Sequence, residues 1–86
     1  MTAVASTIER RRIHVQGVVQ GVGFRPFVYG QALRCGLGGF VLNDSAGVTI
    51  EIEGAPADLE AFERALREQP PPLARIDRVA AEALPP

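Results

Sequence analysis

The sequence predicts an α+β fold, in which four strands form one antiparallel sheet and two helices cover one of its faces. Three observations predict it. Two long segments alternate apolar and polar residues as half-buried strands do, two others repeat apolar residues at helical spacing, and turns rich in glycine or proline separate them. The 86 residues are enough for one domain and too few for two cores.

The first predicted strand covers residues 11–19. Its side chains alternate between a polar face that includes His14 and an apolar face that includes Ile13 and Val15. Gly17 interrupts this alternation, which is typical of a bulge or of a close approach by another backbone.

The first predicted helix covers residues 26–35. Pro26 suits the first helical position, because the N–H that it lacks would be unpaired there in any residue. Gly36 is a natural stop, and Arg34 suits the negative C-terminal end of the helix. One apolar stripe runs along it, formed by Phe24, Phe27, Val28, Ala32 and Cys35.

The next two strands form a predicted hairpin. Residues 40–42 are a short apolar run that ends at residues 43–47, a cluster of turn-forming side chains. Val48, Ile50 and Ile52 then alternate with polar residues, the clearest strand pattern in the chain. Two strands joined by such a turn pair as antiparallel neighbours.

The second predicted helix follows Pro56 and buries a stripe of Leu59, Phe62 and Leu66. Its solvated face carries two i,i+4 pairs, Glu60 with Arg64 and Glu63 with Arg67, each contributing roughly 0.2–0.5 kcal/mol. Three prolines at residues 70–72 end this helix, and residues 76–83 form a weaker last strand.

The resulting order, βαββαβ, is that of the ferredoxin-like sandwich. We expect the folded domain to cover residues 10–84, with a flexible N-terminal arm at residues 1–9 and a linker or cut end at residues 85–86. This fold serves many functions, so a function must be argued from a site.

Charge and hydropathy exclude some classes of protein. The chain has nine basic residues, all of them arginine, and ten acidic ones. It therefore lacks the basic excess that is usual in nucleic-acid-binding proteins. No apolar run approaches the ~20 residues that cross a bilayer, and the first nine residues lack the apolar core of a secretory signal. We expect a cytoplasmic protein, with a monomer favoured.

The single cysteine, Cys35, cannot form an internal disulfide, and we expect it to act as a small buried hydrophobe. A reactive thiol is the alternative. No ligand set suits zinc, so the sequence predicts a site without metal and without a cofactor.

The segment between the first strand and the first helix carries the strongest functional signal. Its residues are Gln20, Gly21, Val22, Gly23, Phe24 and Arg25. Two glycines allow successive backbone N–H groups to converge on an anion, the helix start adds a partial positive charge, and Arg25 brings a planar fork of donors. Together they predict an oxyanion site, best suited to phosphate. The alternative is a tight turn with Arg25 on the surface.

This segment is neither of the common phosphate loops. A P-loop needs a lysine, and the chain has none. The glycine spacing also lacks the βαβ unit and the following acidic residue of a dinucleotide-binding fingerprint.

Asn43 is the second candidate site residue. It precedes a turn, where asparagine is common for local reasons. If its strand lies beside the first strand, its amide could instead hold a water molecule near the bound phosphorus, donating and accepting at once. We expect His14 to be a solvated strand residue and Glu51 and Glu53 to serve solubility.

The run from Val18 to Arg25, with Asn43 before a glycine-containing turn, resembles the signature of the acylphosphatase family over most of the chain. Residues 25–29, 41–44 and 71–77 are most similar to the N-terminal domain of the hydrogenase-maturation carbamoyltransferases of the HypF type. Stand-alone acylphosphatases usually lack the stretch at residues 25–29.

The resemblance implies a metal-free hydrolase that converts an acyl phosphate into a carboxylate and inorganic phosphate. It assigns the phosphate cradle to the backbone of residues 20–24 and to Arg25, and the orientation of the attacking water to Asn43. In the carbamoyltransferases the substrate is carbamoyl phosphate, and further domains of the same chain use the carbamate in building the cyanide ligands of nickel–iron hydrogenase. The isolated domain could be weak or inactive without them.

Two alternatives remain open at this point. One is a stand-alone acylphosphatase of broad specificity. The other is a non-catalytic binding module on the same fold, although an RNA-binding sheet would display aromatic residues on its open face, where this chain offers His14, Thr49 and Glu51.

Overall fold

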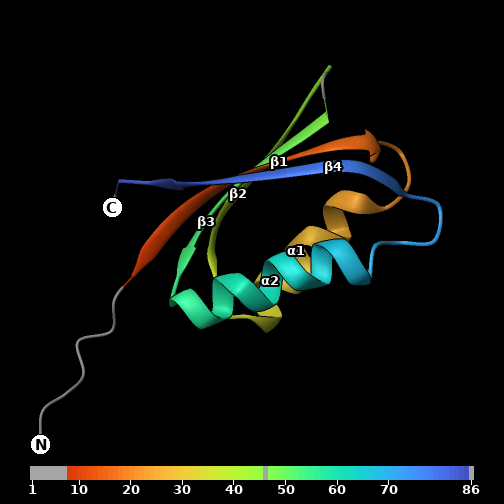
Figure 1. The fold of residues 1–86 in the computed structure, drawn as a ribbon. Helices are drawn as coiled ribbons and strands as arrows, with labels where there is room; N and C mark the ends of the chain where they lie inside the picture. The colour runs from red at the N-terminus through yellow and green to blue at the C-terminus, as the bar shows by residue number, and fades with distance from the viewer. Residues whose placement is uncertain (1–7, 46, 86) are drawn as a thin grey trace, which may run out of the picture.

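The computed structural model describes residues 8–45 and 47–85, and its elements follow the predicted βαββαβ order (Figure 1). They are β1 (Glu9–Val18), α1 (Phe24–Arg34), β2 (Gly38–Asp44), β3 (Gly47–Gly54), α2 (Pro56–Glu68) and β4 (Arg75–Leu84). β1 therefore begins inside the segment predicted as an arm. Residues 1–7 and 86 lie outside the described residues.

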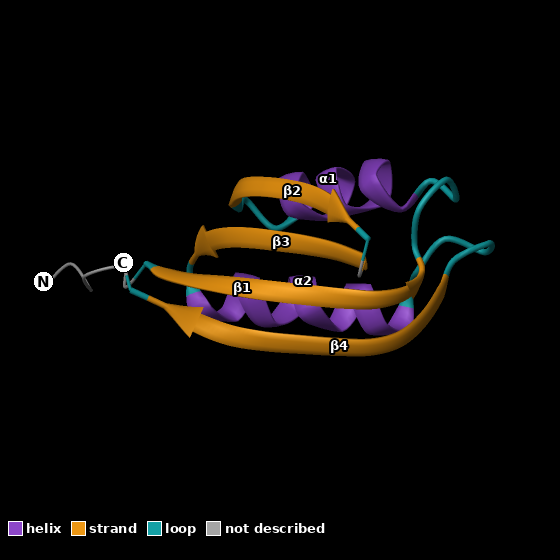
Figure 2. Ribbon diagram, turned by 90° about the horizontal axis from the view of Figure 1, so that it is seen from above, coloured by secondary structure: helices purple, strands orange, loops and turns teal. Residues whose placement is uncertain are grey.

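The four strands form one sheet in the order β2-β3-β1-β4, and all neighbouring strands are antiparallel (Figure 2). Both helices cover the same face, as predicted (Figure 1). β1 lies between its partners β3 and β4, whereas β2 is an edge strand paired only with β3. The pairing of β1 with β4 shifts by one residue between Gln16 and Gly17, and a Cβ at Gly17 would collide with the carbonyl of Arg75, so both the bulge and the close backbone approach expected at Gly17 are found.

The core lies between the sheet and the helices. Ile13, Val15, Val48 and Ile50 from the two central strands are completely buried. They meet the predicted α2 stripe of Leu59, Phe62 and Leu66, which is also completely buried, and Phe24 and Val28 from α1. The period-2 and helical patterns thus identified the buried faces correctly.

α1 begins two residues earlier than predicted. Gly23 is its N-cap, and the N–H of Phe27 donates the first helical hydrogen bond to the carbonyl of Gly23, at 3.2 Å. Pro26 is therefore the third helical residue rather than the first. The position is tolerated because N–H groups of the first turn have no acceptor within a helix.

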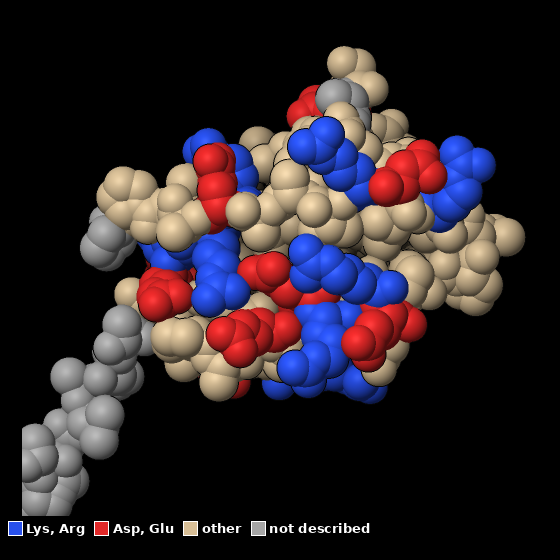
Figure 3. All heavy atoms as spheres, viewed as in Figure 1, with Lys and Arg blue, Asp and Glu red and all other residues tan. Residues whose placement is uncertain are grey.

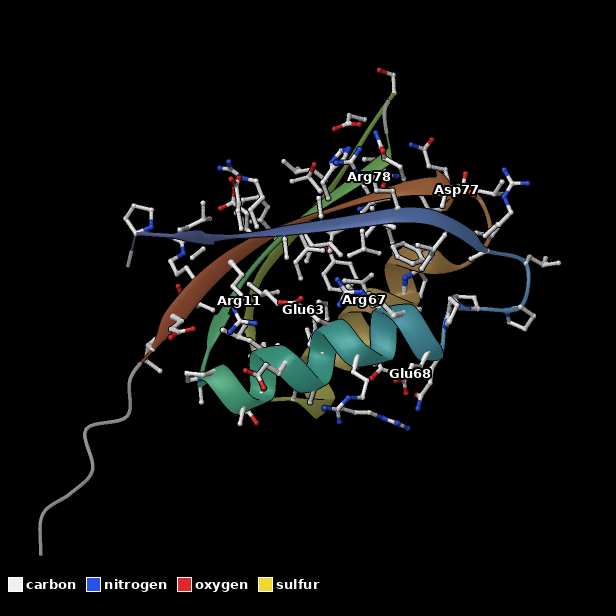
Figure 4. The ribbon with its side chains drawn as sticks, in the orientation of Figure 1. Arg11, Glu63, Arg67, Glu68, Asp77 and Arg78 are labelled. Carbon is white, nitrogen blue, oxygen red and sulfur yellow. The ribbon has the colours of Figure 1, made fainter. Side chains whose placement is uncertain are left out.

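Glu63 corrects the prediction of a fully solvated α2 face. Its side chain is only 13% exposed, and its Oε2 accepts a hydrogen bond from Arg11 Nη1 at 2.8 Å (Figure 4). Arg11 projects from the same face of β1 as Ile13, so it reaches across to α2, and its bond to Glu63 raises the pKa of its guanidinium. The Glu63–Arg67 pair forms at 3.5 Å, whereas the described residues show no ion pair between Glu60 and Arg64.

The open face of the sheet carries charges of both signs. Arg12 bridges Glu51 on β3 and Glu82 on β4, both at 3.1 Å, and Figure 3 shows the two signs intermixed on one side of the molecule. His14 Nδ1 lies 2.9 Å from the hydroxyl of Thr49. These side chains satisfy one another, as expected of a polar surface rather than of an acid–base site.

Two other sequence predictions concern Cys35 and membrane spans. Cys35 packs half-buried against the core, and burial raises the pKa of its thiol. Within residues 8–45 and 47–85, neither helix is long and apolar enough to cross a bilayer.

Candidate active site

The loop after β1, the first turn of α1 and the end of β2 enclose an open hollow of about 500 Å³. Six of the seven predicted site residues line it, namely Gln20, Gly21, Gly23, Phe24, Arg25 and Asn43. The exception is Val22, whose side chain packs half-buried against the core and which contributes to the loop through its backbone.

Gly21 and Gly23 both adopt left-handed backbone conformations, with φ of 71° and 79°. A Cβ atom at either position would meet no atom within 4 Å, so glycine is required by the backbone conformation and not by lack of space. Alternation of left-handed residues with others turns successive N–H groups toward one side, which is the geometry of an anion nest.

The N-terminus of α1 lies at the same hollow, which Phe24 and Arg25 both line. Because the first helical bond is the one from Phe27, the N–H groups of Phe24 and Arg25 have no backbone acceptor in the described part of the chain. The first turn holds no acidic residue, whereas the first turn of α2 holds Asp58. No acidic side chain of this turn therefore offsets the positive end of the α1 dipole.

Arg25 is exposed at this helix end, and among the residues that the structure describes it has no carboxylate within ion-pair distance. A cation in the first turn of a helix is unfavourable by roughly 0.3–1 kcal/mol, because it faces the positive end of the dipole. A bound anion would reverse this cost, since it attracts the guanidinium and the dipole together.

Asn43 lines the hollow although its strand is not a neighbour of β1. β2 does not lie beside β1, because β3 separates them. Asn43 has the same orientation along β2 as the buried Val41, so its side chain faces the side of the sheet that the helices cover. α1 lies on that side, and its N-terminus meets the end of β2 there. Asn43 therefore lines the same hollow as the glycine loop, although the condition stated for this, that its strand lies beside the first strand, is not met.

Three residues that line the hollow were not among the predicted site residues, namely Val19, Pro26 and Tyr29. Tyr29 and Pro26 form a wall beside Arg25, and Tyr29 is 48% exposed. A usable signal was present, since Tyr29 follows Arg25 by four residues and so projects from the same face of α1.

Sequence reasoning also assigned Gln20 through its backbone alone. In the structure its side-chain Nε2 donates to the carbonyl of Asp44 at 2.7 Å and to the carbonyl of Gly47 at 3.3 Å. No pattern in the sequence pointed to this contact, because it joins segments more than twenty residues apart.

Within residues 8–45 and 47–85, no group of three or more histidine, cysteine, aspartate or glutamate side chains lies close enough together to hold a metal ion. The donors that line the hollow are backbone N–H groups, an arginine and an amide, which suit an anion.

Comparison with known proteins decides the family. The sequence profile of the family described as Acylphosphatase matches residues 11–86. The chain belongs to the acylphosphatase family. This assignment confirms the resemblance, the fold and the predicted class of enzyme, a hydrolase of acyl phosphates.

Two kinds of acylphosphatase-family relative are similar to this chain. The carbamoyltransferase HypF of Rhizobium leguminosarum bv. viciae is 58% identical over 76 residues, which cover 88% of this chain and 10% of the relative. The acylphosphatase of Mannheimia succiniciproducens is 42% identical, over 81% of this chain and 78% of the relative. The chain therefore spans about a tenth of the carbamoyltransferases and most of a stand-alone acylphosphatase.

A solved structure gives the same result. The crystal structure of full-length HypF in its phosphate- and nucleotide-bound form superposes with a TM-score of 0.93 and 43% identity. The match covers 96% of this chain and 11% of that one.

Proposed function

We propose that the hollow binds the phosphoryl group of an acyl phosphate, with Arg25 and the backbone of residues 20–24 as its cradle and with Asn43 orienting the attacking water. The observation that supports it most is the first turn of α1. There an unpaired arginine, free N–H groups and two left-handed glycines converge without any acidic side chain. A bound anion would offset this accumulation of positive charge.

The chemistry follows from these groups. Water attacks the phosphorus, the bond between phosphorus and the acyl oxygen breaks, and a carboxylate leaves. Negative charge on the phosphoryl oxygens is held by Arg25 and the loop N–H groups, which bind more tightly as that charge shifts in the transition state.

The Asn43 amide both donates and accepts hydrogen bonds, so it can hold water in one orientation. Among the described residues, no carboxylate or imidazole lines the hollow. We assign the proton of the water to a non-bridging oxygen of the substrate.

For the substrate we propose carbamoyl phosphate, hydrolysed by this chain as the N-terminal module of a HypF-type carbamoyltransferase in the maturation of nickel–iron hydrogenase. The support is the higher identity with carbamoyltransferases, 58% against 42% for the stand-alone acylphosphatase. The proposal includes the cytoplasm as its compartment, further domains of a parent chain as its partners, and neither nucleic acid nor membrane. A stand-alone acylphosphatase of broad specificity is the alternative.

The experiment separates binding from turnover. Phosphate affinity and the hydrolysis of benzoyl phosphate and carbamoyl phosphate are measured for the wild type, Arg25→Ala and Asn43→Ala. Arg64→Ala is the matched control, because Arg64 is exposed on α2, far from the hollow in sequence and without an ion pair in the described structure.

We expect Arg25→Ala to lose both phosphate binding and turnover, Asn43→Ala to keep phosphate binding and lose turnover, and Arg64→Ala to match the wild type. Full activity in both site variants would refute the assignment. A strong preference for benzoyl over carbamoyl phosphate would favour the alternative.

A further inference from the structure

One side chain ties together the two segments that carry the site. Gln20 lies at the start of the glycine loop, immediately before Gly21, and its Nε2 bonds the carbonyls of Asp44 and Gly47 at 2.7 and 3.3 Å. Asp44 directly follows Asn43. A side-chain amide NH2 group has two donors, and both are used here on the hairpin that carries Asn43.

The hairpin needs such a tie, because β2 is an edge strand. Within the part of the chain that the structure describes, β2 pairs with β3 alone, and Asn43 and Asp44 pair with Val48 and Gly47 at the hairpin end. In the described residues, the pairing of this hairpin with β1 ends at Val48 and Val15, before the glycine loop begins. The two hydrogen bonds from the Gln20 side chain join the two segments directly.

We propose that Gln20 is a positioning residue for Asn43. The two hydrogen bonds from its side-chain NH2 group hold the hairpin end against the glycine loop, and so set where Asn43 lies relative to a bound phosphoryl group. This inference rests on the proposed function of the site and extends it, because it predicts that the Gln20 side chain governs turnover and not anion binding.

Two features of the contact set the expected effects. Gln20 is exposed, so water can replace its bonds and the cost to overall stability is small. A catalytic group displaced by about 1 Å can nevertheless lower the rate ~100-fold, because orientation contributes much of the barrier reduction. The Gln20 side chain should therefore influence kcat far more than the melting temperature.

The test uses Gln20→Met, which keeps the length of the side chain and removes both donors without adding charge. Gln31→Met is the matched control, because Gln31 lies on α1 and makes no side-chain hydrogen bond in the described structure. We expect Gln20→Met to lower kcat roughly 10- to 100-fold, with phosphate affinity within about twofold of the wild type. Gln31→Met should leave both unchanged.

A double variant distinguishes positioning from an independent role. If Gln20 acts through Asn43, adding Gln20→Met to Asn43→Ala should cause no further loss. Losses that multiply would overturn the inference. So would a wild-type kcat in Gln20→Met, or a fall in phosphate affinity that accounts for the whole loss of activity.

A measurement that needs no catalysis keeps this inference separate from the proposed function. Amide hydrogen exchange at residues 43–45 and 47 should be at least several-fold faster in Gln20→Met than in the wild type or Gln31→Met. If the wild type hydrolyses no acyl phosphate, the proposed function fails, and faster exchange still supports the tie. Unchanged exchange would overturn it.

Discussion

Gly23→Ala adds a single methyl group to the N-cap of α1 and tests whether the glycine loop is built for an anion. The new Cβ would meet no atom within 4 Å, so crowding contributes nothing to its cost. The cost comes from φ of 79°, a left-handed conformation that disfavours an L-residue by roughly 1–2 kcal/mol. The loop can relieve this strain by rotating the peptide, which turns an N–H group away from the hollow.

The expected result is a loss in phosphate binding. Since about 1.4 kcal/mol corresponds to a factor of ten, we expect phosphate affinity to fall about tenfold, with a destabilisation of about 1 kcal/mol. The assay is a phosphate titration by calorimetry, beside unfolding in urea.

Gly30→Ala is the matched control. Gly30 lies inside α1, its Cβ would also meet no atom within 4 Å, and its φ is not left-handed. Alanine is favoured there by roughly 0.5–1 kcal/mol, so this variant should be more stable and bind phosphate normally. Wild-type phosphate affinity in Gly23→Ala, or equal effects of the two substitutions, would refute the account of the loop.

Three other predictions concern the fold. Glu63→Gln should lower the free energy of unfolding, measured in urea, by about 1–2 kcal/mol, because the Arg11–Glu63 pair is partly buried and its loss should cost more than that of an exposed pair and less than that of a fully buried one. Glu60→Gln should change the same free energy by less than about 0.5 kcal/mol. Phe62→Ala should cost about 3–5 kcal/mol, because Phe62 is completely buried, and a melting temperature within a few degrees of the wild type would contradict this. Cys35 should react with a thiol reagent at pH 8 more slowly than free cysteine, since its raised pKa leaves less thiolate; an equal or faster rate would contradict its burial.

Most of the fold could be predicted from the sequence, because the signals were local. The alternation around Val48 and Ile50 and the helical spacing of Leu59, Phe62 and Leu66 depend only on the period of each element. The start of α1 could not be placed correctly in this way. It depends on the left-handed conformation of Gly23 and on a hydrogen bond to its carbonyl, which the sequence signal of Pro26 does not report.

The site was predictable where its residues are contiguous and less so where the chain brings distant segments together. The residue types from Gln20 to Arg25 predicted an anion site, with a tight turn that leaves Arg25 on the surface as the alternative. The position of Asn43 at the hollow depends on the strand order β2-β3-β1-β4 and on α1 covering the same face. The hydrogen bonds of the Gln20 side chain depend on where the hairpin ends in space. Likewise, the contact between Arg11 and Glu63 joins residues 52 positions apart, beyond the range of helical spacing rules.

The most direct test of the central claim is the release of inorganic phosphate from carbamoyl phosphate and benzoyl phosphate by the purified chain in the presence of EDTA. The account predicts turnover that is insensitive to EDTA and that Arg25→Ala abolishes. Turnover that EDTA removes, or that survives Arg25→Ala unchanged, would contradict a cradle built from Arg25 and the glycine loop.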